Sequence, residues 1–252
     1  MQILSCIQGT DYVPDAVLEL SETAKAYQFE EEMPQSELTN ILVRLINFRA
    51  MVKNGLITDC FEILATAASI DQDLASWSLI LPNDWSYTEH NTDNFQDAYK
   101  GQYHTYKNFY VASNYNNCRT ARILLNDMIW DRLNSLSALQ QTELDSAAIR
   151  QTITNTILQL ASEISGSVFF YLHGEGVQKG LHTIPPMARG VSLLWPLWIL
   201  GNNPVVPVDM KLWIIKVLAN IGKTMGIRFA TDQSQYLNYL ASLGWSVRPY
   251  TD

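Results

Sequence analysis

Cysteine and clustered basic residues are both scarce in this sequence of 252 residues. The 3 cysteines, Cys6, Cys60 and Cys118, lie far apart, so their spacing indicates no CxxC pair, zinc ribbon or disulfide framework. We expect reduced thiols in an intracellular protein.

No run of Lys or Arg occurs, and the sequence has 17 basic and 25 acidic residues, for a formal net charge of −8. Because nucleic-acid binding requires clustered cations, we expect no direct DNA binding by this chain.

Long apolar runs and familiar catalytic motifs are also missing. The longest apolar run, Val191 to Leu200, is interrupted by Pro196 and is about half the length that a membrane-spanning helix needs. The start MQILSCIQG has no basic region and is not a secretory signal. No HExxH, P-loop, GxSxG or GxGxxG pattern occurs. We therefore predict no membrane span, no metal site and no cofactor.

Helical periodicity dominates the residues that are present. Apolar residues recur at intervals of three and four along most of the chain, which predicts an all-α fold of roughly eight to ten helices in a single domain over residues 1–252. Pro34 should close a first segment over 11–33 and Ser36 should cap the next, while Thr142 and Asp145 resemble a capping box. The further predicted helices cover residues 36–54, 58–80, 92–133, 142–165, 207–225 and 231–243. No alternating run is long enough to predict a sheet.

An aromatic stripe marks the predicted helix over residues 92–133. Its members follow one another at steps of three or four: Phe95, Tyr99, Tyr103, Tyr106 and Tyr110. Such a stripe usually packs in a core, and the competing interpretation is a cradle for a cofactor. Asn114 to Asn117 could bend or divide the helix.

Six sequence blocks carry a family resemblance. They are DQDLASW at 71–77, LPNDW at 81–85, NNCRTARILL at 116–125, ARGVSLLWPLWILG at 188–201, LWI at 212–214 and IGKTMGI at 221–227. In order and spacing they resemble the fungal-specific transcription factor domain, the regulatory domain of Zn₂Cys₆ zinc-cluster transcription factors. The resemblance covers about residues 38–245.

The resemblance implies an all-α regulatory region, often self-associating, that lies between a DNA-binding zinc cluster and an activation function. The family's zinc cluster needs closely spaced cysteines on a basic segment, and this chain has none. We therefore expect it to act through a protein partner, as a homodimer, or through a small-molecule ligand. It is either a fragment or a complete protein that has lost its DNA-reading module, and the start at Met1 favours the second.

Two further hypotheses follow from the missing zinc cluster. In one, a stand-alone copy of the fold serves as an enzyme of fungal secondary metabolism, a cofactor-independent cyclase or isomerase with an aromatic-lined pocket. In the other, the chain is a scaffolding or dominant-negative partner of a complete regulator. We expect a nuclear location for a regulator and a cytoplasmic one for an enzyme.

The candidate site residues divide between these hypotheses. His173 and Glu175 flank Gly174 after an aromatic run, and a His beside a carboxylate can act as a general base, although a polar loop at a helix end is the competing interpretation. These two would be catalytic only in an enzyme. The candidate ligand-binding residues are Tyr171, Arg122, Arg189 and Trp195. The arginines would bind an anionic or carbonyl group, unless they pair with acids such as Asp127 or Asp131.

Overall fold

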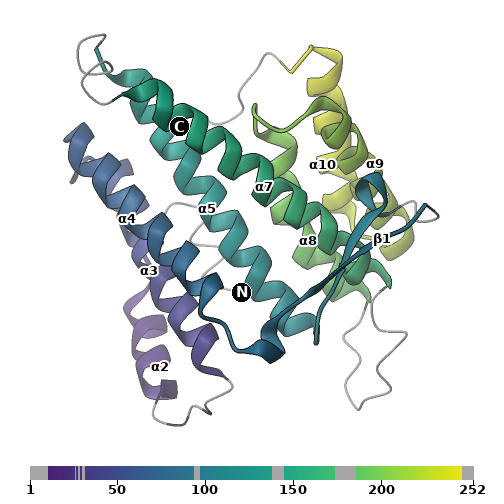
Figure 1. The fold of residues 1–252 in the computed structure, drawn as a ribbon, viewed down its shortest axis with the longest axis horizontal. Helices are drawn as coiled ribbons and strands as arrows, with labels where there is room; N and C mark the ends of the chain where they lie inside the picture. Colours follow the sequence, from purple (N-terminus) through teal and green to yellow (C-terminus); the bar gives the residue numbers. More distant parts are fainter. Residues whose placement is uncertain are drawn as a thin grey trace. The chain divides into compact units, whose positions relative to one another are not determined.

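Helices make up most of the chain in the computed structural model (Figure 1). The structure describes residues 11–25, 27, 29, 32–93, 97–137, 145–173 and 186–245. Among these residues it contains eight α-helices and one sheet of two short strands. The prediction of an all-α fold is confirmed.

The chain forms two compact units, and each is described by itself. Unit 1 comprises Met1–Leu81 and Ala121–Ile153, and unit 2 comprises Pro82–Thr120 and Thr154–Asp252. Two long helices, α5 (Phe109–Ser135) and α7 (Ser146–His173), contribute residues to both. The single domain expected over residues 1–252 stays a prediction.

Unit 1 is built on the neighbouring helices α3 (Met33–Lys53) and α4 (Cys60–Leu79) (Figure 1). The short helix α2 (Asp15–Lys25) precedes them. The carboxylate of Asp59 caps α4 by accepting a hydrogen bond of 2.8 Å from the backbone N–H of Glu62. The buried indole of Trp77 donates to the carbonyl of Pro34 at 2.6 Å. Apolar side chains from α3, α4 and α5 form the core of unit 1, among them Leu45, Ile46, Leu74, Leu125 and Leu133.

The start of α3 differs from the prediction at Pro34 and Ser36. Pro34 lies in the first turn of the helix and Glu32 occupies the capping position, so Ser36 is inside the helix. Proline suits a first turn because its ring fixes φ at a helical value and its missing N–H would have no partner there. The proposed capping box begins at Thr142, which lies outside the described residues.

A hairpin in unit 2 replaces the predicted helix from Thr92. Strand β1 (Thr88–Asn91) pairs antiparallel with β2 (Gln102–Thr105), and α5 begins only at Phe109. The short 3-10 turn η2 (Asn83–Trp85) precedes the hairpin, and a second one, η3 (Tyr99–Gly101), lies between its strands, directly before β2. Lys100 and Gly101 have φ values of 52° and 75°, which a helix does not allow. The predicted helical stripe is therefore wrong, and its member Phe95 lies outside the described residues.

Two helices continue further than predicted. Asn114 to Asn117 do not divide α5, and α7 extends beyond the predicted end at residue 165, through Gly166 to His173. Gly166 allows a close approach, because a Cβ atom there would lie 2.5 Å from Nε2 of His104. Tertiary packing in unit 2 thus explains the glycine at this position of α7.

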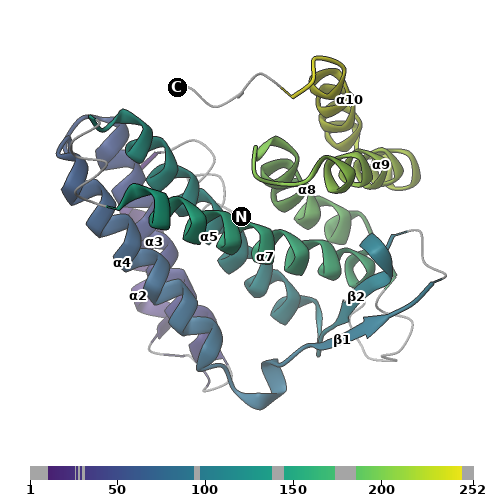
Figure 2. The same cartoon turned by 45° about the horizontal axis from the view of Figure 1, so that its top comes forward.

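The C-terminal part of unit 2 consists of α8 (Pro186–Asn202), α9 (Val208–Met225) and α10 (Arg228–Ser242) (Figure 2). Gly226 follows the last residue of α9 in the left-handed conformation, which agrees with the predicted end of this helix at residue 225. Close packing of α8 and α9 with α10 depends on small residues. A Cβ atom at Gly201 would lie 2.5 Å from Leu237, and one at Gly222 would lie 2.2 Å from Thr231.

Candidate functional site

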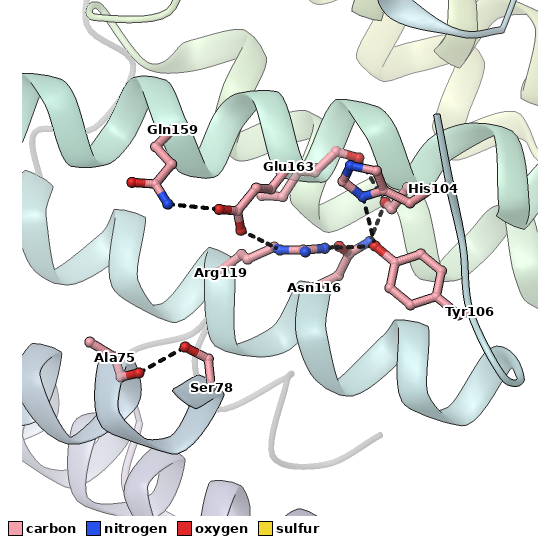
Figure 3. Close-up of polar contacts among 10 residues, drawn as sticks. Ala75, Ser78, His104, Tyr106, Asn116, Arg119, Gln159 and Glu163 are labelled. Carbon is pink, nitrogen blue, oxygen red and sulfur yellow. Dashed lines mark hydrogen bonds and ion pairs between the residues drawn. The ribbon is translucent and has the colours of Figure 1, made fainter. Parts of the chain in front are cut away.

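A buried arginine is the centre of the most extensive polar cluster described in unit 2. Arg119 of α5 is only 2% exposed, and its Nε donates to Oε2 of Glu163 on α7 at 2.9 Å. Its Nη1 donates to the hydroxyl oxygen of Tyr106 at 2.9 Å and to Oδ1 of Asn116 at 3.2 Å (Figure 3). These bonds fix the guanidinium between two helices and the residue that follows β2. We call Arg119, Glu163, Tyr106, Asn116 and His104 the Arg119 cluster.

Aromatic rings enclose the guanidinium of Arg119. Its Cζ lies 5.1 Å from the ring centroid of Tyr87 and 4.9 Å from that of Tyr115, within cation–π range. Burial raises the pKa of Tyr115 to about 12, and it also raises the pKa of Tyr87 and Tyr106. All three phenols are therefore neutral near pH 7. Burial alone would lower the pKa of Arg119, but Tyr106 and Glu163 raise it above its ordinary value.

His104 completes the cluster as a neutral ring. Its Nδ1 lies 3.1 Å from the hydroxyl of Tyr106, and its ring stacks on Tyr87 with centroids 4.5 Å apart. Burial, followed by the charge of Arg119, lowers the pKa of His104 from 6.5 to about 4. Because Arg119 already donates to the Tyr106 oxygen, the Tyr106 hydroxyl can donate to an unprotonated Nδ1.

Further hydrogen bonds extend the cluster along α7. Asn116 donates from Nδ2 to Oγ of Ser167 at 2.9 Å, and Gln159 donates to Oε1 of Glu163 at the same distance (Figure 3). The terminal NH₂ group of Arg119 at Nη2 is buried without a hydrogen-bond partner. The arrangement couples a fixed cation to neutral phenols and an uncharged imidazole. Such a group of residues suits structural positioning and electrostatic stabilisation better than proton transfer.

The candidate ligand-binding residues lie on different elements. Tyr171 of α7 is fully buried, its hydroxyl donates to Oγ of Ser113 at 3.4 Å, and burial raises its pKa. Arg189 and Trp195 belong to α8, where the Nε of Arg189 and the indole Nε1 of Trp195 are buried without hydrogen-bond partners. Arg122 belongs to unit 1 and pairs with Asp71 through two bonds of 2.9 and 3.2 Å.

The candidate catalytic histidine has a carboxylate neighbour that its sequence context does not reveal. Nε2 of His173 lies 2.7 Å from Oδ2 of Asp97, and its ring packs against Phe169 with centroids 4.7 Å apart. About half of the His173 side chain is exposed. The expected partner, Glu175, lies outside the described residues, so its role stays a prediction. Asp97 was missed because 76 positions separate it from His173.

Comparison with known proteins indicates a relationship to transcription factors. A stretch of 135 residues is 33% identical to Transcription factor dbaG of Emericella nidulans, and it covers 50% of this chain and 30% of that protein. No family model matches the sequence, and no solved structure matches it. The matched stretch therefore covers less than a third of the length of this relative.

The part of the chain that the structure describes contains neither a membrane-spanning helix nor a cluster of metal ligands. No described helix is long and apolar enough to span a membrane. No group of three or more His, Cys, Asp or Glu side chains among the described residues could hold a metal ion.

The Arg119 cluster was only partly visible in the sequence. Arg119 lies three residues before Arg122 on one predicted helix, whereas its partner Glu163 lies beside the apolar residues Leu160 and Ile164 of another. A single acidic residue beside such apolar residues indicates a buried ion pair, because charged side chains are rarely buried without a partner. The identity of that partner depends on tertiary packing.

Proposed function

We propose that this chain is a regulatory domain of transcription control that acts through protein partners or a small-molecule ligand and does not itself bind DNA. The 33% identity over 135 residues to Transcription factor dbaG carries this proposal. The net charge of −8 and the lack of basic runs support the second part, because a duplex repels an acidic surface. The proposed location is the nucleus. The proposed protein partner is either a second copy of the chain or a complete regulator.

Helix α8 is the proposed place for a small-molecule ligand. The buried Nε of Arg189 and Nε1 of Trp195 have no hydrogen-bond partner. A buried donor without an acceptor destabilises a protein by about 1–3 kcal/mol, and a ligand oxygen would offset that loss. Of the candidate ligand-binding residues, these two therefore have the strongest support, and Tyr171 is buried in the same unit. Arg122 already has a carboxylate partner in Asp71.

Gene deletion with transcript profiling tests the regulatory role. We expect a defined group of transcripts to change on deletion and to recover when the chain is restored. A fluorescent fusion should accumulate in the nucleus, and the purified chain should associate with itself or with a regulator in sedimentation experiments. A cytosolic protein whose deletion leaves all transcripts unchanged would refute the proposal.

A second candidate function is the cofactor-independent cyclase or isomerase of secondary metabolism. The pair of His173 and Asp97 favours it, because a carboxylate at 2.7 Å can orient an imidazole that acts as a general base. In that case His173→Ala or Glu175→Gln should lower turnover by about 10²–10⁴-fold with little change in thermal stability. His90→Ala is the matched control, since His90 pairs with Thr105 at 2.9 Å. Full activity in the His173 and Glu175 variants would exclude this site.

A further inference from the structure

A lysine of α9 is buried without a carboxylate partner among the described residues. Lys211 is only 3% exposed, and α9 packs against α8 and α10 within unit 2 (Figure 2). No hydrogen bond or ion pair joins its ammonium to another described side chain, and burial lowers its pKa from 10.5 to about 8. The lysine is therefore positively charged in most molecules near pH 7. A buried charge normally has a partner, because its removal from water is unfavourable.

The carboxylates of the surrounding helices are engaged elsewhere. On α8, α9 and α10 the acidic residues are Asp209 and Asp232. Asp209 accepts a hydrogen bond of 2.7 Å from Tyr99 and lies 3.1 Å from the ammonium of Lys100. Asp232 lies 3.9 Å from Arg228 on its own helix. Neither acid contributes to the lowered pKa of the buried lysine. The other titratable side chains of these three helices are Arg189, Lys216, Lys223, Tyr236 and Tyr239.

The indole of Trp245 covers the buried ammonium from one side. Its ring centroid lies 4.5 Å from Nζ of Lys211, within cation–π range. The backbone of Trp245 has a left-handed φ of 57°, which residues other than glycine rarely adopt. Its N–H donates to the carbonyl of Leu240 at 2.9 Å, which holds it to the end of α10. Strained backbone of this kind is frequent at ligand-binding positions.

The indole leaves the hydrogen-bonding capacity of the ammonium unused. A lysine ammonium has three N–H donors, whereas an aromatic face attracts the charge but offers no lone pair. A carboxylate supplies both acceptor oxygens and the single negative charge that neutralises one lysine. A phosphate dianion carries more charge than one lysine neutralises, and a cation would be repelled. A monocarboxylate therefore matches the missing partner.

We propose that Lys211 and Trp245 form a binding site for a small aromatic carboxylate, an inference that goes beyond the regulatory function proposed above. The carboxylate pairs with the ammonium of Lys211, and the ring of the ligand packs against the half-buried indole of Trp245. Aromatic pairs are more favourable than burial of their area alone explains, so an aromatic ligand is preferred over an aliphatic one. The residues of this site differ from Arg189 and Trp195 on α8.

Isothermal titration calorimetry with the purified 252-residue chain tests the site. The probes are benzoate, phenylacetate and cinnamate, at up to about 10 mM and about pH 7. We expect saturable binding of at least one of them. Benzyl alcohol has a ring but no charge, and it should bind about tenfold or more weakly than that probe, the scale of a hydrogen bond to a charged group. Cyclohexanecarboxylate has the charge but no aromatic ring, and it should bind about threefold more weakly.

Substitutions separate the contributions of the two residues. Lys211→Met removes the charge and should weaken the tightest probe by about tenfold or more. Trp245→Leu removes the aromatic face and should weaken it by about threefold. Lys216→Met is the matched control, because Lys216 is exposed on the same helix, and it should leave the affinity unchanged. Urea unfolding should give Lys211→Met a midpoint equal to or above that of wild type, because an apolar side chain replaces a buried charge.

The pH dependence of binding gives a measurement on the unmodified chain. Because the pKa of Lys211 is about 8, the charged form decreases from most molecules at about pH 7 to about a tenth at about pH 9. The affinity for the probe should therefore decrease by about tenfold over this range. Binding near pH 8 should take up protons, since the carboxylate stabilises the charged lysine, and calorimetry in buffers of different ionisation enthalpy measures this uptake. In Lys211→Met both effects should be absent.

Several outcomes would overturn the inference. They are no saturable binding of any of the three carboxylates, full affinity in Lys211→Met, or an affinity of wild type that does not change with pH. Tighter binding of inorganic phosphate than of the carboxylates would also overturn it. Loss of binding in Arg189→Ala together with full binding in Lys211→Met would assign the carboxylate to α8 instead. Transcript changes on gene deletion test the regulatory role separately, so the failure of one proposal is distinguishable from the failure of the other.

Discussion

The Arg119 ion pair is asymmetric, which allows a specific test at the scale of single residues. The exposed fraction is 3% for the Arg119 side chain and 24% for that of Glu163. Glu163→Ala would leave a buried cation without its carboxylate, and removing one member of a buried pair usually destabilises a protein by about 3–5 kcal/mol. Because Glu163 retains some exposure, we expect about 3 kcal/mol, measured by urea unfolding.

A surface ion pair provides the control for Glu163→Ala. Arg44 and Asp73 lie 2.6 Å apart, but both are well exposed. Asp73→Ala should change the free energy of unfolding by less than about 1 kcal/mol, because water screens exposed charges. Similar losses in Asp73→Ala and Glu163→Ala would show that the Arg119 pair has no special role in the fold.

His104 should make the stability of the protein dependent on pH. Its pKa falls from 6.5 to about 4 through burial and the nearby charge of Arg119. Between these two values the unfolded chain binds a proton that the folded chain does not, so stability decreases as the pH falls through this window. Above about pH 6.5 His104 does not lower the free energy of unfolding. By about pH 4.5 its lowered pKa should reduce that free energy by about 2 kcal/mol.

The variant His104→Asn isolates this effect from the titration of other groups. Asparagine keeps an acceptor near the Tyr106 hydroxyl but does not titrate. The difference in unfolding free energy between wild type and His104→Asn should therefore shift by about 2 kcal/mol between about pH 7 and about pH 4.5. A difference that is independent of pH would mean that folding leaves the pKa of His104 unchanged.

At the scale of elements, helices were predictable where periodicity and end signals agreed. Helix α9 follows Pro207 and is capped by Gly226, as its apolar stripe and these two residues indicate.

The hairpin of β1 and β2 was missed because its tyrosines also recur at helical intervals. Yet His104 and Tyr106 are buried while Thr105 is exposed, which is the alternation of an extended strand. The left-handed conformation at Lys100 and Gly101 decides between the two patterns.

The candidate site was less predictable than the helices. Hydrogen bonds join Arg119 to Glu163 across 44 positions and His173 to Asp97 across 76. Nothing local in the sequence specifies such pairs, because they depend on how helices pack. The short interval between His173 and Glu175 suggested a nearer partner, but a distant carboxylate is the neighbour that the described structure contains.

Gly222 gives a test of the packing between α9 and α10. A Cβ atom there would lie 2.2 Å from Oγ1 of Thr231 and 3.0 Å from its backbone nitrogen, so α10 would have to move. Gly222→Ala should therefore destabilise the protein by about 2–3 kcal/mol in urea unfolding. Gly226→Ala is the control, because open space surrounds it and only its left-handed φ of 70° opposes alanine, at about 1 kcal/mol. The reverse order would contradict this packing.

For the whole molecule, the charge balance predicts that the chain will not bind duplex DNA on its own. DNA affinity comes largely from the release of counterions when Lys and Arg clusters neutralise phosphates, and weak non-specific complexes have dissociation constants of about 10⁻⁴–10⁻⁶ M. With 17 basic and 25 acidic residues, this chain lacks that driving force. Fluorescence anisotropy with labelled promoter duplexes should therefore show no saturable binding at about 10 μM protein and about 150 mM salt. A fusion of the chain to an unrelated DNA-binding module should bind the site of that module, which would show that the chain does not block DNA binding by a neighbour. A sequence-selective complex of the unfused chain that survives competitor DNA would contradict the prediction, because its specificity would need a groove-reading surface on an acidic molecule.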